Sequence, residues 1–344
     1  MTREASPGAP EIAVVAFAQS GTLRTTEEHS EVEMLMPVLH DVLQQTGLKT
    51  ADIGFTCSGS SDYLAGRAFS FIAAVDAIGA FPPIHESHVE MDAAWALYEA
   101  WLKIKMGEVE TALVYGFGKS SAGQLRRVLA LQLDPYVVTP LWPDSVSIAG
   151  IQARSGLEAG LWSEKDLAEV AARGTGKDVA ELLDTPYYAD PLRRHDIAPI
   201  TDGAAVIVLS TVERAREIVE RPAVITGIEH RVDSPVLGAR DLTRSPSTEA
   251  AGKALDLDGV DLAELHAPFT HQELILRTAL GLGDGVKINP SGGALAANPM
   301  FSAGLARIGE AAVRIHSGES RKAVAHATSG PALQQNLVTV LEAR

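Results

Sequence analysis

The chain has 344 residues, of which 46% are hydrophobic and 21% charged, a composition typical of one large or two ordinary globular domains. Its formal net charge of −15 argues against binding nucleic acid through the phosphates and against adhesion to anionic membranes. The only cysteine, Cys57, excludes an intrachain disulfide and suits the reducing cytoplasm, where we expect the protein to work. The N-terminus lacks the apolar run of a signal peptide, and no segment approaches a membrane span.

The first third of the chain alternates short apolar runs with helical patterns. Residues Glu11–Gln19 predict a buried strand, and the spacing from Ser30 to Thr46 predicts a helix that ends near Gly47. Further strands are expected at Ile53–Cys57, Ile84–Val89 and Thr111–Gly116, with helices at Ala65–Ile78 and Asp92–Met106. This alternation predicts a largely parallel sheet covered by helices.

The pattern changes between Lys119 and Asp196, where prolines interrupt amphipathic pieces such as Ser163–Arg173, and we interpret this segment as an insertion. A strand at Ala204–Leu209 then closes the first series of elements. The second series is expected to contain strands Ala223–His230, Leu262–Leu265, Lys322–His326 and Leu337–Leu341, and helices Ser247–Leu255, Gln272–Leu280 and Phe301–Ile315. The two series share an order of elements without a visible sequence repeat.

Four segments resemble thiolases of the sterol-carrier-protein branch, in the same order and with similar spacing. Ile288–Leu305 (INPSGGALAANPMFSAGL) resembles NPSGG…GHP…GATGL, and Glu264–Leu274 (ELHAPFTHQEL) resembles ELHDCFSTNEL. Asp190–Ser210 (DPLRRHDIAPITDGAAVIVLS) resembles PL…CCPTSDGAAAVVL, and Ile104–Gly123 (IKMGEVETALVYGFGKSSAG) resembles IQGGVAECVLALGFEKMSKG. The resemblance spans nearly the whole chain.

This resemblance implies an α/β thiolase fold, in which a duplicated αβαβα arrangement of five layers packs the sheets of both halves on shared helices. It places the N-terminal half at residues 1–118 and 197–222 and the C-terminal half at 223–344. The insertion, residues 119–196, corresponds to the loop domain that covers acyl-CoA like a lid.

The nucleophilic cysteine of the family is replaced. It lies seventeen residues before the second glycine of the IQGG-like turn, and counting back seventeen from Gly107 reaches Glu90. His88–Leu97 (HVEMDAAWAL) aligns with NNCATGSTAL in the same register. The remaining replacements are Pro268 for the acid/base cysteine, Ala267 for its neighbouring aspartate, and Asn298 for the histidine of GHP. Without a thiolate in the pocket, transfer through an acyl-enzyme is not available.

Two alternatives stay open for Glu90, which precedes the helix expected from Asp92. It is either an acid that stabilises the helix N-terminus, by about 0.3–1 kcal/mol, or a general base tuned by partial desolvation. Because Asp92 is the more natural N-cap, Glu90 is left free for chemistry. Cys57 ends a predicted strand, and we interpret it as a structural or half-buried thiol rather than a substitute nucleophile.

His266 is retained at the position of the family's oxyanion-hole histidine. Asn298 can donate from its amide but cannot move a proton, so the sequence predicts an oxyanion hole without the second catalytic histidine. His326 is expected to approach the same pocket from the C-terminal loop, with a buried strand-end histidine as the alternative. Tyr63 and His88 are weaker candidates of the same kind.

The glycine and basic residues give less specific signals. Close backbone approach to a thioester ligand is expected at Gly292, Gly293 and Gly330, although tight turns explain these glycines equally well. An anionic acyl-CoA needs a basic patch, for which the candidates are Arg126 with Arg127 or Arg193 with Arg194; solvated surface charge is the alternative. No metal-binding or dinucleotide motif is present, so we predict no metal and no cofactor besides the CoA of the substrate.

These features suit a reaction in which a CoA-thioester enolate forms without an acyl-enzyme. The first interpretation is retro-aldol cleavage of a 3-hydroxyacyl-CoA in steroid or lipid side-chain degradation, because the chain resembles Cys-less homologues of the lipid-transfer-protein type. Those homologues work with a small zinc-ribbon/OB-fold acyl-CoA-binding partner. The alternatives are a catalytically inactive subunit that supports an active thiolase paralogue, and a conventional acyltransferase. The resemblance also implies a homodimer, or a heteromer with a paralogue, paired near Ile84–Val89.

Overall fold

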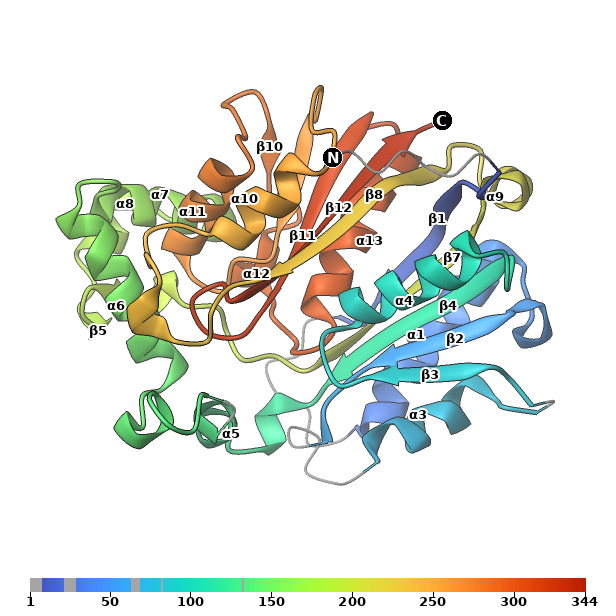
Figure 1. Cartoon of the computed structure of the whole chain (residues 1–344), viewed down its shortest axis with the longest axis horizontal. Helices are drawn as coiled ribbons and strands as arrows, with labels where there is room; N and C mark the ends of the chain where they lie inside the picture. The colour runs from blue at the N-terminus through green and yellow to red at the C-terminus, as the bar shows by residue number, and fades with distance from the viewer. Residues whose placement is uncertain (1–7, 22–28, 63–68, 82, 132) are drawn as a thin grey trace.

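A computed structural model describes residues 8–21, 29–62, 69–81, 83–131 and 133–344. The strands of the first half are β1 (Ile12–Gln19), β2 (Phe55–Gly59), β3 (Glu86–Val89), β4 (Thr111–Gly118) and β7 (Gly203–Thr211). Those of the second half are β8 (Ala223–Val232), β9 (Leu262–Leu265), β10 (Lys287–Ile288), β11 (Lys322–Ser329) and β12 (Gln335–Ala343). Within the described ranges they form one mixed sheet of ten strands (Figure 1).

The two halves of this sheet are topological copies. The order β3-β2-β4-β7-β1 repeats as β10-β9-β11-β12-β8. In each copy the three strands at the outer edge are parallel, and the two inner strands pair antiparallel. The halves join where β1 pairs with β8 over two residue pairs. The expected duplication is therefore confirmed, whereas a largely parallel sheet is wrong, because β1, β7, β8 and β12 close each half by antiparallel pairing.

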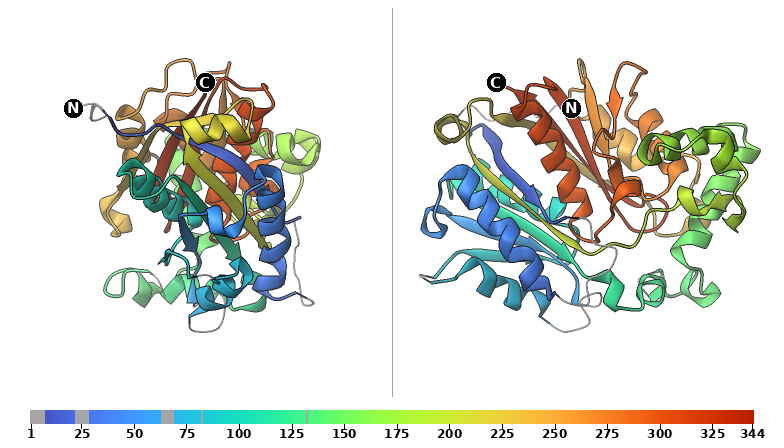
Figure 2. Two further views of the ribbon diagram at one scale, coloured as in Figure 1. Left: turned by 90° about the vertical axis from the view of Figure 1, so that its right-hand side faces the viewer. Right: turned by 180° about the vertical axis from the view of Figure 1, so that it is seen from behind.

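Helices cover both faces of each half. Figure 1 shows α4 (Ala93–Lys105) in front of β2 and β4, and the view from behind in Figure 2 shows α1 (Glu31–Thr46) on the opposite face. In the second half α10 (Pro246–Lys253) lies in front and α13 (Ala303–His316) behind. The apolar faces of α4 and α13 share one buried core with strands of both halves, which makes them the common central layer.

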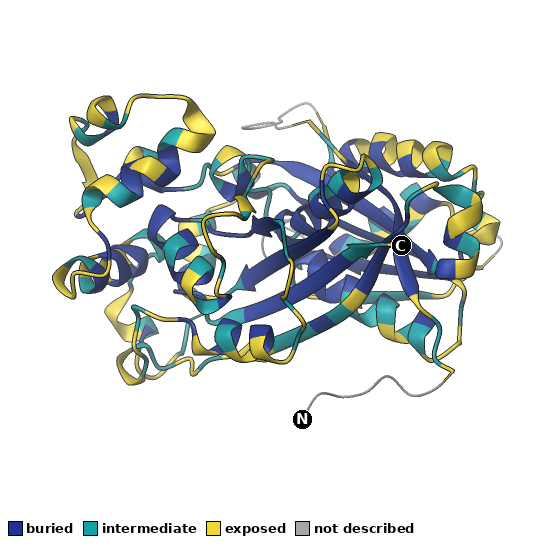
Figure 3. Ribbon diagram, turned by 90° about the horizontal axis from the view of Figure 1, so that it is seen from above, coloured by how far each residue is buried: buried dark blue, intermediate teal, exposed yellow. Residues whose placement is uncertain are grey.

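The outer layers complete the arrangement. On the first half, α1 packs beside α3 (Ser70–Ile78) over a separate core, and on the second half α10 packs beside α11 (Thr270–Ala279). Figure 3 shows the strands buried along most of their length and the outer helices exposed on their far sides. Two short helices, α9 (Val212–Ile218) and α12 (Gly293–Ala296), complete the halves. The expected helix start at Ala65 lies outside the described residues.

Local sequence signals explain the helix ends. Ser30 and Glu33 form a capping box at the start of α1, and Gly47 ends the helix with a φ of 69°. The start of α13 is later than predicted, because Phe301 has a φ of 66° and its carbonyl accepts a hydrogen bond from Ala93 instead of starting a helix.

The segment between β4 and β7 forms the projection at the left of Figure 1. It contains α5 (Leu125–Leu131), α6 (Ser145–Glu158), α7 (Glu164–Thr175), α8 (Val179–Leu183) and the hairpin of β5 (Tyr187–Ala189) and β6 (Leu192–Arg193). A buried polar contact attaches it to the second half, because Gln152 Oε1 lies 3.0 Å from both His271 Nε2 and Gln272 Nε2. No helix among the described residues is long and apolar enough to cross a membrane.

Candidate functional site

Glu90 lies in the bend between β3 and α4, where its side chain is 51% exposed. One carboxylate oxygen accepts the backbone N–H of Asp62 at 3.2 Å, and the other lies 3.4 Å from His88 Nε2. Glu90 is thus held at both oxygens while its side chain stays open to a ligand. Tyr63, a weaker candidate of the sequence, lies outside the described residues.

Asp92, rather than Glu90, caps α4, as predicted, and it also caps α13. The Asp92 carboxylate, in a residue only 5% exposed, accepts the backbone N–H of Ala94 at 2.9 Å, of Gly304 at 2.9 Å and of Leu305 at 3.0 Å. Both central helices therefore direct their N-termini at one carboxylate, which their dipoles stabilise. The sequence indicates the first cap, but no local signal indicates a contact 212 residues further along the chain.

His266 and Asn298 are brought together by the fold. The Nε2 atom of His266 lies 2.9 Å from Asn298 Oδ1, while His266 Nδ1 accepts the backbone N–H of Thr328 at 3.4 Å. Because Nδ1 accepts, the proton of the neutral ring sits on Nε2 and is donated to Asn298 Oδ1. This leaves the amide N–H₂ of Asn298, rather than His266, free to donate to a ligand.

The surroundings of His266 keep it uncharged. The residue is 7% exposed, and burial lowers the pKa of the imidazole below its ordinary value despite the nearby Asp92 carboxylate. A neutral ring is the form that the tautomer argument requires. The predicted oxyanion hole of His266 and Asn298 thus becomes a pair in which the histidine orients and the asparagine donates.

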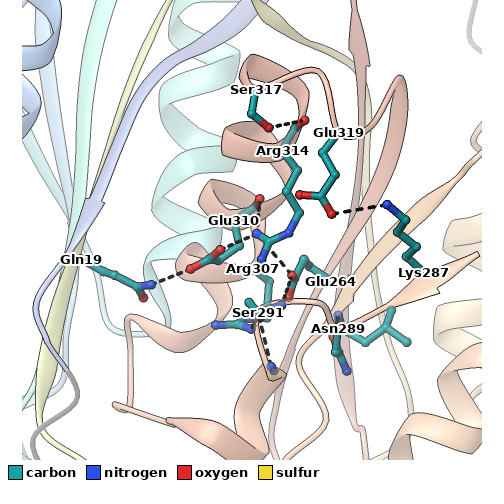
Figure 4. A network of polar contacts seen from close by, with 12 residues as sticks. Gln19, Glu264, Lys287, Asn289, Ser291, Arg307, Glu310, Arg314, Ser317 and Glu319 are labelled. Atoms are coloured by element: carbon teal, nitrogen blue, oxygen red, sulfur yellow. Dashed lines mark hydrogen bonds and ion pairs between the residues drawn. The ribbon is translucent and has the colours of Figure 1, made fainter. Parts of the chain in front are cut away.

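A buried polar network around Glu264 lies alongside α13 (Figure 4). Glu264 is fully buried on β9 and accepts hydrogen bonds from Ser291 Oγ at 2.6 Å and from Arg307 Nη1 at 3.0 Å. Asn289 Oδ1 accepts the backbone N–H of Leu265 at 2.6 Å, which ties the following loop to the same strand. His266 directly follows Leu265, so this network also fixes the position of the His266 backbone. In the sequence, Glu264 stands out only as the first residue of the thiolase-like segment ELHAPFTHQEL.

The predicted glycines adopt backbone conformations that other residues rarely accept. Gly292 has a φ of 90°, Gly293 of 60° and Gly330 of 75°. A Cβ atom at Gly293 would also lie 3.0 Å from the Asn289 side chain. The tight turns are therefore present, while contact with a thioester stays a prediction. The sequence did not single out Gly118, where a Cβ would lie 2.1 Å from the Met300 carbonyl and displace the segment that carries Asn298.

His326 is not in the C-terminal loop, so that expectation is corrected. It lies within β11, fully buried, with Nε2 2.9 Å from Asn336 Oδ1. Burial lowers the pKa of this imidazole to about 3, so the ring is neutral at physiological pH. Its connection to the site is structural, because its backbone carbonyl accepts the N–H of His266 at 3.1 Å. The alternative of a buried strand histidine describes it better.

Cys57 is fully buried in the central core, and burial raises the pKa of its thiol well above the ordinary value. Its sulfur lies 3.8 Å from Glu99 Oε2, a carboxylate that further disfavours a thiolate. A protonated, enclosed thiol does not attack a thioester. The interpretation of Cys57 as structural fits this environment.

The candidate basic residues separate into two kinds. Arg193 is 8% exposed, binds Glu164 at 2.6 Å and lies over the Tyr187 ring at 4.5 Å, so it holds the hairpin in place. Arg126 and Arg194 instead both lie over the exposed Tyr188 ring, at 5.8 and 5.7 Å from its centroid. One member of each predicted arginine pair thus contributes to a single cationic surface, where Arg126 Nη1 also lies 3.7 Å from the Asp144 carboxylate.

Comparison with known proteins gives a partial match in sequence. No protein-family model matches the chain. An acetyl-CoA acetyltransferase of Methanothermobacter thermautotrophicus is 27% identical over 177 residues, which cover 44% of this chain and 46% of the relative. An acetyl-CoA acetyltransferase of Methanocaldococcus jannaschii is 30% identical over 159 residues, covering 38% and 41%. The chain therefore spans less than half the length of these curated relatives.

Solved structures match over almost the whole length. Human mitochondrial 3-ketoacyl-CoA thiolase has a TM-score of 0.78 at 14% identity and covers 97% of this chain and 99% of its own. The chain has the thiolase fold. A structure named Ltp2-ChsH2(DUF35) aldolase also shares it, with a TM-score of 0.76 at 17% identity and coverage of 97% and 98%. In this thiolase fold, α4 and α13 are the central helices, and Glu90, Asp92 and Asn298 lie at or just before their N-termini.

Proposed function

We propose that this thiolase-fold protein binds an acyl-CoA and cleaves a 3-hydroxyacyl-CoA by a retro-aldol reaction without an acyl-enzyme. The observation that carries this proposal is the pair of His266 and Asn298, 2.9 Å apart, which presents an amide donor where the chain offers no accessible thiol. An oriented donor without a nucleophile can stabilise an enolate but cannot accept an acyl group.

The reaction assigns each group one task. Glu90 accepts the proton of the β-hydroxyl, the Cα–Cβ bond breaks, and the β-carbon leaves as an aldehyde or ketone. The electron pair of the broken bond passes to the thioester as an enolate, whose oxygen accepts a hydrogen bond from the Asn298 amide. Solvent water then supplies a proton to the α-carbon, which gives the shortened acyl-CoA, and Glu90 releases the proton it accepted to solvent. The groups that act are one exposed carboxylate and one neutral donor.

The comparisons support chemistry on CoA thioesters in general. The curated relatives are named for acetyl transfer to or from CoA, and one protein of the same fold is named an aldolase. The absence of an accessible cysteine among the described residues favours the second chemistry for this chain. We infer from the original resemblance that Glu90 occupies the nucleophile's position.

The cationic surface of Arg126, Tyr188 and Arg194 supplies a place for the phosphates of CoA. Tyr188 is 51% exposed, and the two guanidinium groups lie over its ring in a chain whose net charge is −15. Because that overall charge repels an anionic ligand, a local pair of arginines is needed to bind it. We propose that acyl-CoA approaches across this surface.

The assembly belongs to the same proposal. The name of the aldolase structure includes a second protein, ChsH2(DUF35), and this chain resembles homologues that use a small zinc-ribbon/OB-fold partner. We propose a dimer paired through β3, alone or with a thiolase paralogue, and a small acyl-CoA-binding partner in the cytoplasm. Steroid or lipid side-chain degradation is the proposed context.

A second candidate function is an inactive subunit that supports an active paralogue. It is favoured by one observation: among the described residues, no contact joins Glu90 directly to His266 or Asn298. In that case Glu90, His266 and Asn298 mark the remnant of a site whose two sides no longer act together.

Single substitutions at Glu90, Asn298 and His266 separate the two functions in a retro-aldol assay of a 3-hydroxyacyl-CoA with the reconstituted complex. Glu90→Gln removes the base and should lower turnover by about 10²–10⁴ with little change in ligand binding. Asn298→Asp still accepts from His266 but loses the amide donor, and should lower turnover by about 10²–10³, as should His266→Ala. Glu108→Gln, at an exposed surface position, is the matched control. Wild-type rates from all three variants would end the catalytic proposal.

A further inference from the structure

Ser58, His88 and Glu90 form a continuous chain of polar contacts at the edge of the sheet. Strands β2 and β3 place Ser58 and His88 side by side in register, with Ser58 Oγ 3.0 Å from His88 Nδ1. The other ring nitrogen, His88 Nε2, lies 3.4 Å from Glu90 Oε2. The His88 ring stacks on Phe71 at 4.7 Å with an interplanar angle of 19°, which restricts its rotation.

The chemistry of the three groups fixes the direction of each hydrogen bond. An ionised carboxylate only accepts, so the proton of the neutral His88 ring sits on Nε2 and is donated to Glu90. His88 Nδ1 must then accept, and the Ser58 hydroxyl donates to it.

Side-chain exposure shows which end of the Ser58–His88–Glu90 series of contacts can react. Ser58 is fully buried, the His88 side chain is 18% exposed and the Glu90 side chain is 51% exposed. A serine sealed inside the sheet cannot attack a substrate, so the arrangement is not a serine nucleophile with its base. Accessibility instead rises from the serine to the carboxylate, which makes Glu90 the end that a ligand meets.

We propose that Ser58 and His88 are positioning residues that orient Glu90 as the base of the proposed retro-aldol step. The inference rests on that proposed function. His88 donates to one carboxylate oxygen of Glu90 while the backbone N–H of Asp62 binds the other, which fixes the plane of the carboxylate. Ser58 in turn fixes the tautomer of His88. An oriented carboxylate loses less freedom when it meets the hydroxyl proton, so the pair raises turnover rather than affinity.

The geometry is tested without an activity assay. Long-range ¹⁵N–¹H NMR of the full-length protein at neutral pH should show His88 as the Nε2–H tautomer. In Ser58→Ala, where Nδ1 has lost its donor, the spectrum should change to a mixture of tautomers. His85 lies three residues away on the same segment and is exposed, so its signals should be the same in both proteins. A His88 ring with its proton on Nδ1, or one unaffected by Ser58→Ala, would overturn the inference.

The catalytic consequence is tested by a double-mutant cycle in the retro-aldol assay. His88→Phe keeps an aromatic ring against Phe71 but loses both hydrogen bonds, and should lower kcat about 10–100-fold with KM nearly unchanged. His88→Gln, which retains an amide donor, should recover part of this loss, and His85→Gln should behave as wild type. In a Glu90→Gln background, His88→Phe should have no further effect, because His88 acts only through Glu90.

The outcomes separate the two proposals. If Glu90→Gln is impaired and His88→Phe lowers kcat equally in both backgrounds, or not at all, the positioning role fails while the proposed function stands. If Glu90→Gln retains wild-type turnover, the proposed function fails, and the role of His88 in it fails as well.

Discussion

Histidine residues in this protein are differentiated by burial. His271 and His326 are both fully buried, and burial lowers the pKa of each to about 3. His266 and His316 are shifted in the same direction by the same cause. Neutral rings are compatible with their surroundings, because the Nε2 atoms of His271 and His326 each lie close to an uncharged amide oxygen, of Gln152 and Asn336. At the site, burial likewise favours the neutral form of His266, which faces the Asn298 amide.

The buried histidines predict an acid-sensitive fold. In the unfolded chain each histidine regains a pKa near about 6.5, so the unfolded state binds protons below that pH that the folded state does not bind. The contribution of these neutral rings to the free energy of unfolding should therefore be complete above pH ~6.5. It should fall as pH is lowered towards ~3, by up to about 1.4 kcal/mol per pH unit for each fully buried ring. Urea unfolding between about pH 7 and pH 5 measures this slope.

A variant identifies the source of the slope. His271→Gln removes one titrating ring beside Gln152 and should flatten the pH dependence, whereas His85→Gln, at an exposed position, should leave it unchanged. An unchanged slope in His271→Gln would show that its protonation does not contribute.

Cys57 should be unreactive in the native protein. The thiol is fully buried and burial raises its pKa, so iodoacetamide should leave any activity unchanged. A thiol-reactive dye should label nothing in the folded protein and one thiol after denaturation, since Cys57 is the only cysteine. Rapid labelling of the native protein with loss of turnover would return Cys57 to the centre of the mechanism.

At the scale of secondary structure, the Asp92 side chain joins the two central helices, α4 and α13. Asp92 accepts from both N-termini, and Ala93 donates to the Phe301 carbonyl at 2.8 Å in the same place. The loop that carries Asn298 is therefore fixed against α4. This junction links the half that holds Glu90 to the half that holds His266.

Removal of this junction should cost more than removal of an ordinary cap. Asp92→Ala leaves three buried backbone N–H groups without their acceptor and should lower the free energy of unfolding by about 2–4 kcal/mol. Asp144→Ala, which removes the cap of α6 and a partly exposed ion pair with Arg126 at 3.7 Å, should cost only about 0.5–2 kcal/mol. Denaturant melts of both variants give the comparison. Equal losses would mean that the contact with α13 adds no stability.

At the scale of the whole molecule, the exposed edge of the sheet is a candidate interface for assembly. Among the described strands, β3 ends the strand order and pairs with β2 alone. Each of its residues is nevertheless half-buried, and Phe81 is 95% exposed just before it. An unprotected edge of this kind readily pairs with another strand.

We therefore expect the purified protein to be at least a dimer, alone or with a paralogue. Sedimentation velocity at micromolar concentration measures this directly, and backbone hydrogen exchange should show β3 protected in the assembly. A monomer with fast exchange along β3 would contradict the expectation. Because the edge includes His88, loss of the dimer should also disturb the surroundings of Glu90.

The sequence by itself determined most of the elements, because their signals are local. A buried strand needs only a run of apolar residues, and α1 needs only Ser30, Glu33 and Gly47 at its ends. The shared order of elements in the two halves indicated a duplication, which the strand order of the sheet confirms. His266 and Asn298 were found through resemblance, and neither periodicity nor composition would have selected them.

Only the tertiary structure decided how the site residues meet. Strand register put His88 beside Ser58, helix packing brought Asp92 to α13, and the β5–β6 hairpin put Arg126 and Arg194 over one tyrosine. It also moved His326 out of the expected pocket and into the core. Apart from Arg194 and Tyr188, which are neighbours in one hairpin, these contacts join residues far apart in the chain. Local periodicity does not predict such contacts, because they depend on how complete helices and strands pack against one another.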